Sequence, residues 1–388
     1  MIYTYMERKC LKMFRGYFIL GVILFLGSNL YSQDFKIVPT SRLLVDGATY
    51  LGEENVELTD GVSIRDFRMG LKATYSSFFL KADVSFANNK VSLKDIYGQY
   101  NVNNHSFLRI GHFTVPFGLQ SAYGTAHKQF MAEPSSNIYQ VGRRVGVMHS
   151  VWNKRLWLSY GIFADLKSIS ESTDVSGSQG YNLAQRFTYK PINTDEHLLQ
   201  LGFSMNHIKA EAPGKDHPKS FNYKTGYLTV VDKTKAINAV VDHARYENKY
   251  TVELAGIYKS VAIESQYYWS NIKRRELPSF NSDGFYVVAK GILLNRSDYK
   301  YNSQTAGINH PSSKNALELA IGYSMVNMNS NKAAIYGGRM DDISIGLAFY
   351  LNKYITFRTN YSYITVKPGA GDPKKTVNAL QVRAQYYF

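Results

Sequence analysis

Arginine and lysine recur on one side of segments that alternate between apolar and polar residues. In the segment 65–75 the odd positions are mainly apolar, and Arg68 and Lys72 stand at even positions. In the segment 77–86 an apolar row faces away from Lys81. The guanidinium of arginine stays charged, and its planar fork binds phosphate oxygens in a bidentate manner. Rows of such cations therefore predict a surface that attracts small anions.

The same alternation, with a period of two, runs through the rest of the chain. This is the period of a β-strand whose two faces meet different surroundings. No long helical pattern and no linker interrupts the series, so we expect a single all-β domain. Further apolar rows of this kind lie in the segments 156–162, 199–205, 317–325, 343–351 and 380–388.

Two architectures fit alternating strands: a soluble sandwich, and a membrane barrel with its apolar side outward. The segments are about 10 residues long, which is the length of a tilted membrane strand. Tyrosine and phenylalanine, 31 and 21 in number, gather near the segment ends, as in the interfacial girdles of membrane barrels. The charged opposite face could not be buried in a sandwich core. We therefore expect a transmembrane antiparallel β-barrel around a water-filled lumen.

The first 32 residues have the features of a secretory signal peptide. A basic region is followed by the apolar stretch 16–27 and by the polar stretch 28–32, after which we expect cleavage. The alternative is a membrane anchor, but the apolar stretch is too short to span a bilayer as a helix. The barrel domain then covers residues 33–388. The residues of the basic region are Arg8, Lys9, Lys12 and Arg15.

Composition narrows the functional classes. The only cysteine, Cys10, leaves with the signal peptide, which excludes a disulfide scaffold and a multi-cysteine zinc site. Loss of the signal, with four basic residues and Glu7, lowers the formal net charge from +15 to +12. This balance favours an anionic partner, and export excludes nucleic acid from that role. Because the sequence has no H-E-x-x-H, P-loop or G-x-S-x-G motif, we expect no enzyme, metal or cofactor.

Seven segments match, in order, the sequence pattern of one family of membrane barrels. The segment 107–119 (FLRIGHFTVPFGL) is similar to the pattern RIGQFKVPF, and 141–147 (VGRRVGV) is similar to the strand that follows it. With the terminal Phe388, these segments resemble the phosphate-selective porin O and P family of Gram-negative outer membranes. Where that family has tryptophan, this chain has Phe285, Leu317 and Phe349. The other matching segments are 64–72, 283–287, 315–320, 346–352 and 380–388.

This resemblance implies a barrel of 16 strands that forms a homotrimer, with a loop folded inward after the VPF residues. The length agrees, because 356 mature residues give about 22 per strand and connection. The segment 117–140 has few alternation signals, and we expect it to be this constriction loop. Pores of the family use lysines at the narrowest point, so Lys128 is the candidate there. His127 would carry charge only at mildly acid pH. The aromatic residues expected to pack the loop against the wall are Tyr123, Phe130 and Tyr139.

If the apolar sides face lipid, the opposite sides face the lumen, and basic residues outnumber acidic ones there. Rings of arginine and lysine are typical of anion pores. The alternative for each cation is a salt bridge that braces the wall. Arg65 and Arg143 have the lipid-facing parity, which indicates a rim position or a shift of register. The expected lumen cations are Arg68, Lys72, Lys81, Arg109, Arg144, Arg186, Lys190, Lys290, Arg358 and Arg383, and the expected carboxylates are Asp66, Asp83, Asp165, Glu253, Glu264 and Glu318.

Together these features predict an outer-membrane porin of a Gram-negative bacterium, in contact with lipid and lipopolysaccharide. Small inorganic anions, with phosphate or polyphosphate as candidates, would diffuse passively through its lumen. Two alternatives stay open: a general porin of little selectivity, and a structural or adhesive barrel with a plugged lumen. Conductance would exclude the plugged barrel, and ion selectivity would separate the two porins.

Overall fold

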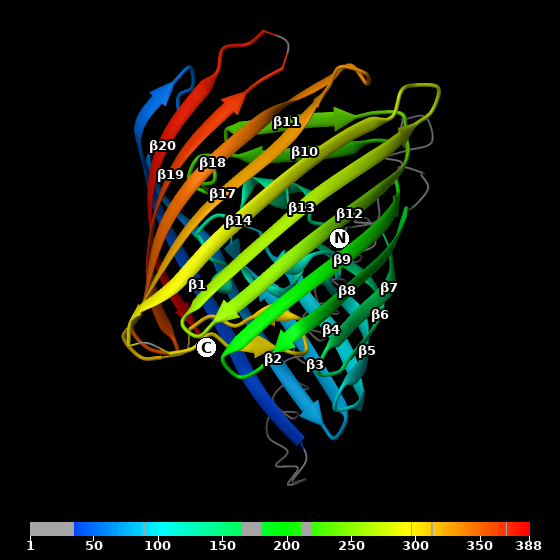
Figure 1. The fold of residues 1–388 in the computed structure, drawn as a ribbon, viewed down its shortest axis with the longest axis vertical. Coiled ribbons are helices and arrows are strands. Elements are labelled where there is room, and N and C mark those ends of the chain that lie inside the picture. Colours follow the sequence, from blue (N-terminus) through cyan, green and yellow to red (C-terminus); the bar gives the residue numbers. More distant parts are fainter. Residues whose placement is uncertain are drawn as a thin grey trace, which may run out of the picture.

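Sixteen strands close into one antiparallel barrel (Figure 1), which confirms the expected architecture. The computed structural model describes residues 35–87, 90–164, 180–210, 219–295, 297–311, 313–369 and 371–388. The predicted signal peptide, residues 1–32, lies outside the described residues, as does Asp165. In chain order the barrel strands are β1 (Phe35–Glu54), β2 (Gly61–Tyr75), β3 (Phe78–Ser85), β4 (Ser92–Asn103), β5 (Ser106–Thr114), β6 (Arg143–Trp152), β7 (Leu156–Ala164), β8 (Tyr181–Asn193), β9 (His197–Lys209), β12 (Ala244–Tyr258), β13 (Val261–Arg274), β14 (Phe280–Leu294), β17 (Ala316–Ser330), β18 (Ile335–Tyr350), β19 (Ile355–Lys367) and β20 (Lys375–Tyr387).

The alternation in the sequence separates the two faces of the barrel. On β8 the odd residues Leu183 and Phe187 are exposed on the outside, whereas the even residues Asn182 and Arg186 are buried inside. An apolar outer face around a polar interior is the arrangement of a membrane barrel. Within the described part of the chain, no helix is long and apolar enough to cross a bilayer.

The barrel has a short-turn end and a long-loop end. Turns of two residues join β2 to β3, β4 to β5 and β12 to β13 at the short-turn end, which is the lower end in Figure 1. Phe388 lies at the same end and exchanges two backbone hydrogen bonds of 3.0 Å with Ser41 of β1. In outer-membrane barrels the short turns face the periplasm and the longer loops face outside.

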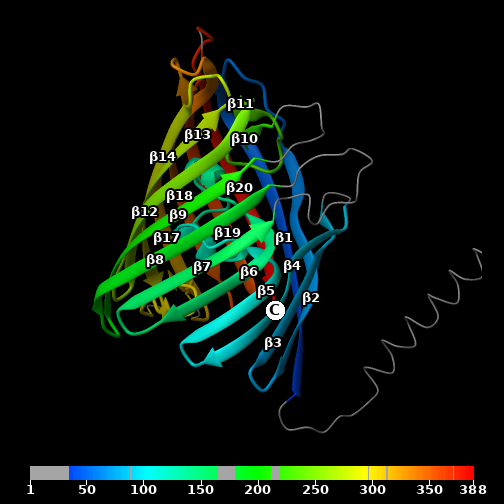
Figure 2. The same cartoon turned by 90° about the vertical axis from the view of Figure 1, so that its right-hand side faces the viewer.

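The segment between β5 and β6 folds into the barrel, which confirms the inward loop expected at 117–140. This constriction loop, residues 115–142, lies inside the ring of strands in both views (Figures 1 and 2). It holds three short 3-10 helices: η2 (Leu119–Ala122), η3 (Thr125–His127) and η4 (Ser135–Tyr139).

Two further segments fold inward, and the sequence predicted neither. The inner hairpin, formed by β10 (Phe221–Gly226) and β11 (Lys235–Val241), crosses the long-loop end, and β11 packs against β18. The inner turn, residues 297–311, carries β15 (Tyr301–Asn302) and β16 (Gly307–Ile308) at the short-turn end. The lumen is therefore narrowed from both ends as well as at its middle.

Candidate ion pathway

The constriction loop is fastened to one side of the barrel. Its Gly118 N–H donates to Ser204 Oγ of β9 at 3.0 Å. Arg358 of β19 donates to the backbone oxygen of Lys128 at 2.8 Å, and Arg383 of β20 donates to that of Met131 at 3.0 Å. Further hydrogen bonds reach β12, β13, β14 and β17. We call the inner faces of these strands, together with that of β18, which packs against η4, the far wall: β9, β12–β14 and β17–β20.

Aromatic side chains of the loop fill positions where the far wall has glycine. A Cβ placed on Gly322 of β17 would lie 2.7 Å from the Phe130 ring, and one on Gly346 of β18 would lie 3.0 Å from it. A Cβ on Gly284 of β14 would lie 2.8 Å from the Tyr139 ring. If the glycine carried a side chain, contacts this close would force the ring to shift, since protein interiors are tightly packed. The expected packing of Phe130 and Tyr139 against the wall is therefore observed, and glycine makes it possible.

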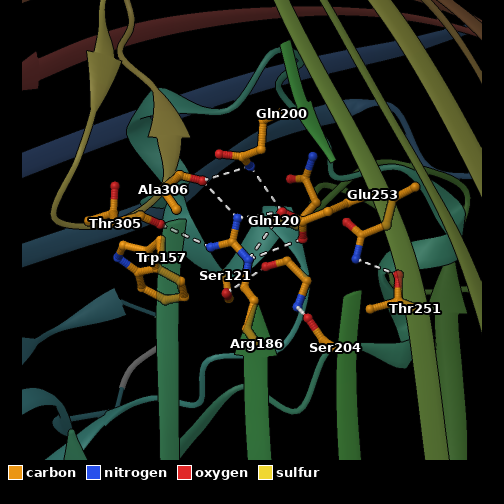
Figure 3. A network of polar contacts seen from close by, with 12 residues as sticks. Gln120, Ser121, Trp157, Arg186, Gln200, Ser204, Thr251, Glu253, Thr305 and Ala306 are labelled. Carbon is orange, nitrogen blue, oxygen red and sulfur yellow. Dashed lines mark hydrogen bonds and ion pairs between the residues drawn. The ribbon is translucent and has the colours of Figure 1, made fainter. Parts of the chain in front are cut away.

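Arg186 on β8 holds the inner turn (Figure 3). The residue is only 1% exposed. Its guanidinium donates to Glu253 on β12 at 2.7 Å and to the backbone oxygens of Thr305 and Ala306 at 2.9 and 2.7 Å. Gln200 donates to the same carboxylate at 3.0 Å. This predicted lumen cation faces inward, but its hydrogen bonds join two strands to the inner turn.

Three more of the predicted cations are buried braces. Lys290 Nζ lies 2.6 Å from a carboxylate oxygen of Glu264, and Arg383 Nε lies 2.6 Å from one of Asp46. Lys190 Nζ donates at 3.2 Å to a backbone oxygen of the turn between β6 and β7. Together with Arg358, these residues face the interior as their parity predicts, but burial keeps them from an open surface of the lumen. For them the brace alternative fits the geometry better than an anion pathway.

On the inner face of β1–β6 most cations can be reached by water, although Arg42 and Arg68 are buried there, at 7% and 8% exposed. The Lys81 side chain is 20% exposed, although it lies within 3.0 Å of two carboxylates. The half-buried Arg109 guanidinium lies 4.2 Å from the Tyr97 ring centre and donates to Gln99 at 2.7 Å. We call this face the basic wall. Its cations are Arg42, Arg65, Arg68, Lys72, Lys81, Arg109, Arg143 and Arg144, and its carboxylates are Asp46, Asp66, Asp83 and Asp95.

Arg65 and Arg143 belong to the interior despite their lipid-facing parity, and the two explanations expected for them apply: a shift of register at Arg65 and a position at a strand end for Arg143. The pairing of β1 with β2 passes from Leu44–Asp66 to Val45–Ile64, so Arg65 is the extra residue of a β-bulge. Its side chain lines a cavity of about 300 Å³ inside the long-loop end. Arg143 is the first residue of β6, and its Nε donates to Asp95 of β4 at 2.7 Å.

Lys128 and His127 lie in the constriction loop as expected, but their surroundings differ from the expectation. Lys128 is 7% exposed, and its Nζ lies 2.7 Å from Glu133 Oε1. Burial opposes the charge of Glu133, yet the Lys128 ammonium outweighs it and holds the pKa of that carboxyl below its usual value. His127 stacks on His310 of the inner turn at 4.0 Å between ring centres. Burial, the His310 ring and neighbouring cations hold the pKa of His127 well below its usual value, which opposes the charge expected for it at mildly acid pH.

Several charged residues of the lumen were missed by the sequence reasoning. Arg42 and Asp46 lie on the inner face of β1, where the apolar Leu44 stands between them and hides the alternation. Asp95 follows a register shift between β3 and β4. Glu247 and Lys249 stand at inner positions of β12, in line with the predicted Glu253, so continuing the parity of that strand would have found them.

A sequence profile of the phosphate-selective porin O and P family matches residues 43–388, nearly the whole chain. The chain belongs to this family. Membership and fold together make it a porin channel of the Gram-negative outer membrane. A search of curated protein sequences gave no match.

Solved outer-membrane barrels share the fold at low sequence identity. A loop-deletion form of OmpT from Vibrio cholerae is 14% identical, with 92% of this chain and 100% of that chain covered and a TM-score of 0.59. The outer membrane channel DcaP of Acinetobacter baumannii is 11% identical, with 92% and 98% covered and a TM-score of 0.56. Salmonella typhi OmpF, solved in complex with daunomycin, is 11% identical, with 92% and 99% covered and a TM-score of 0.56.

Proposed function

We propose that this porin carries small anions by passive diffusion, with phosphate-like oxyanions as the substrate class and the basic wall as their path. The observation that carries the proposal is the unequal exposure of the lumen cations. The side chains of Arg186 and Arg383, which hold inward segments, are each 1% exposed. On the basic wall, the side chains of Lys81 and Arg143 are 20% and 30% exposed.

The constriction loop determines which cations an ion would meet. Because the loop is fastened to the far wall, the remaining passage runs along the basic wall. An anion there would exchange part of its hydration for contacts with successive arginine and lysine side chains. Carboxylates such as Asp66 and Asp95 share these cations, which keeps each contact weak enough for the ion to leave.

The same carboxylates favour the second candidate, a general porin of little selectivity. Asp66 lies between Arg42 and Arg68, and Asp95 lies between Lys81 and Arg143. If these pairs neutralise the wall completely, size alone limits passage. The constriction loop, the inner hairpin and the inner turn all fold into the lumen. A barrel plugged by these three segments is therefore the third outcome of the test.

We further propose a homotrimer in the membrane. One of the similar structures, OmpT of Vibrio cholerae, is described as a trimer form. The short strands β3, β5 and β7 give an independent physical argument, since strands of 8 or 9 residues match the apolar band of a bilayer poorly.

The test is single-channel conductance of the purified porin in planar bilayers under a chloride gradient, with phosphate added in steps. An anion-selective reversal potential and a phosphate-dependent decrease of chloride current are expected. Lys72→Gln on the basic wall should lower the anion preference, whereas Lys353→Gln removes the same charge from an exposed turn and should not. Conductance without selectivity would establish the general porin, and absence of conductance would establish the plugged barrel.

A further inference from the structure

A small cavity lies where the constriction loop and the inner hairpin meet the far wall. Its volume of about 10 Å³ is the space that one water molecule, or a bare ion of similar size, occupies. The loop lines it with the residues 130 and 132–134, and the connection between β10 and β11 lines it with Leu228. The group that fills this cavity therefore borders on all three parts of the structure at once.

The far wall lines the cavity with side chains that carry oxygen atoms. Asp342 of β18 stands opposite Ser324 of β17 in the strand pairing, and both line the cavity. Ser344 of β18 and Ser362 of β19 share a hydrogen bond of 2.7 Å between their Oγ atoms. Asn360 of β19 completes the polar lining on this side. A lining of carboxylate, hydroxyl and amide oxygens suits a hard cation.

Asp342 is a buried carboxyl group with an unused oxygen. The residue is 4% exposed, and its Oδ2 accepts no hydrogen bond from any described residue. The charged group with the largest influence on it is the neighbouring Asp341, which is also negative. Glu133 of the loop lines the cavity as well, but its charge is shared with Lys128 at 2.7 Å. Because a buried carboxylate without a partner is costly, Asp342 must take up either a proton or a cation.

The surroundings of Asp342 favour a cation of single charge. A proton would remove the charge, but the cavity would still have to be filled with water. A cation in the cavity removes the charge and gives the lone pairs of several oxygens a partner at the same time. Within the residues that the structure describes, no three histidine, cysteine or carboxylate side chains gather as a metal site. A divalent ion would therefore lack charged ligands, whereas one carboxylate balances one monovalent cation.

We propose that this cavity binds one monovalent cation, sodium or potassium, between Asp342 and the constriction loop. Ser324 Oγ lies 2.7 Å from Ser135 Oγ of η4, so an oxygen that lines the cavity also contacts the loop. Because the cavity lies in the far wall, the cation would stay in place while other ions pass along the basic wall. The inference goes beyond the proposed function, and it applies to a selective and to an unselective porin alike.

The test is unfolding of the purified barrel in sodium chloride, potassium chloride and choline chloride at the same ionic strength. Choline is too large for the cavity. Replacing choline with sodium or potassium should therefore raise the free energy of unfolding with the logarithm of the ion concentration, once this exceeds the dissociation constant. Asp342→Asn should remove this dependence with almost no change in size. Asp341→Asn is the matched control and should keep it, since Asp341 is the next residue on β18, faces outward and pairs with Arg339.

Equal stability of the parent porin in the three salts would overturn the inference, because a proton on Asp342 and a water molecule in the cavity would then be sufficient. A dependence on sodium or potassium that persists in Asp342→Asn would overturn it too, since the ion would then bind elsewhere. Ser344→Ala removes one oxygen and no charge, and it should raise the dissociation constant of the ion about tenfold. If Asp342→Asn does not fold, an unchanged dissociation constant in Ser344→Ala overturns the site.

Discussion

At the scale of single residues, the lumen contains two kinds of cation with the same sequence signature. Both kinds follow the inward parity of their strands. Arg186 is buried against Glu253 and backbone oxygens, whereas Arg143 pairs with Asp95 and keeps 30% of its side chain exposed. Removing the arginine of each pair should therefore lower the stability of the barrel by very different amounts, because a buried charge without its partner cannot be hydrated.

We expect Arg186→Met to destabilise the barrel by about 3–5 kcal/mol, since it leaves the buried Glu253 carboxylate without its cation. Adding Glu253→Gln should restore much of the loss. Arg143→Met should cost at most about 1 kcal/mol, because Asp95 keeps Lys81 as a partner and the site is partly hydrated. Urea unfolding of the purified porin measures the free energy of unfolding of all three variants. Equal losses for Arg186→Met and Arg143→Met would contradict the distinction between braces and basic wall.

The sequence predicted which residues face inward much better than what they do there. Parity placed Arg186 and Lys290 correctly, because one buried face and one lipid face fix the register. It failed at Arg65, since a bulge inserts one residue without any signal in the composition. The brace role of Arg186 depends on backbone oxygens of Thr305 and Ala306, which are distant in sequence and leave no local pattern.

At the scale of elements, the constriction loop is held by shape as well as by hydrogen bonds. The rings of Phe130 and Tyr139 occupy space over glycines of β14, β17 and β18. A side chain at such a glycine would displace the ring, because overpacking costs about 1–3 kcal/mol. The position of the loop, and with it the width of the passage, should therefore respond to these glycines.

Gly322→Val should displace the Phe130 ring and loosen the constriction loop. The single-channel conductance should then be higher than that of the parent porin or fluctuate more. The matched control is Gly98→Val on β4, where an added Cβ meets no atom within 4 Å. Both variants add the same three-carbon side chain to a barrel strand, so differences in strand preference cancel. An identical conductance of Gly322→Val, Gly98→Val and the parent porin would contradict this account of the loop.

The contact between the constriction loop and the inner turn should depend on pH. Burial, followed by nearby cations, lowers the pKa of His310 from 6.5 to about 4, and burial also holds the pKa of its stacking partner His127 well below its usual value. Both rings are therefore neutral at pH 7. If the contact between the constriction loop and the inner turn loosens, water reaches both histidine rings and they bind protons more readily. The intact contact therefore loses stability as the pH falls from about 6.5 to about 4. The charged groups that act on the pair are Arg42, Lys72, Lys290, Glu318 and Arg358.

We therefore expect the single-channel conductance, recorded between pH 7 and pH 4, to rise or to fluctuate more as the pH falls. His310→Phe keeps a stacking ring without a proton site and should flatten this dependence. His105→Phe, which changes an exposed histidine in the turn between β4 and β5, should leave it unchanged. A dependence that persists in His310→Phe would assign the effect to other groups.

At the scale of the whole molecule, barrel closure followed from the sequence, whereas the filling of the lumen did not. Alternation predicted membrane strands, whereas the number of strands came from the family resemblance, with which the length of the chain agrees. The inner hairpin and the inner turn are connections, and nothing local distinguishes a connection that folds inward from one that projects into water. Tyr301 and Ile308 show this, since their burial depends on β8, β9 and the constriction loop.

The wall of the barrel is uneven in height, and this bears on assembly. β3 has 8 residues and β5 and β7 have 9, whereas β17 and β18 have 15 and 16. Eight residues rise about 26 Å along a strand. At a tilt of about 45° this gives roughly 19 Å of height, less than the apolar band of about 25 Å. Lipid alone matches this side poorly, so a second copy of the chain is the better cover.

We therefore expect the low side of the barrel, around β5, to form the contact between copies in the proposed trimer. Ile110 of β5 and Ile321 of β17 both face outward, 63% and 49% exposed, and their strands lie eight positions apart in the ring of sixteen. A bulkier side chain in a closely packed interface between copies disfavours association, whereas lipid chains adapt to it on the lipid side. Ile110→Trp should release monomeric barrels, and Ile321→Trp should keep the trimer. Native mass spectrometry of the detergent-solubilised porin distinguishes these states, and trimers that persist in Ile110→Trp but dissociate in Ile321→Trp would move the contact to the tall side.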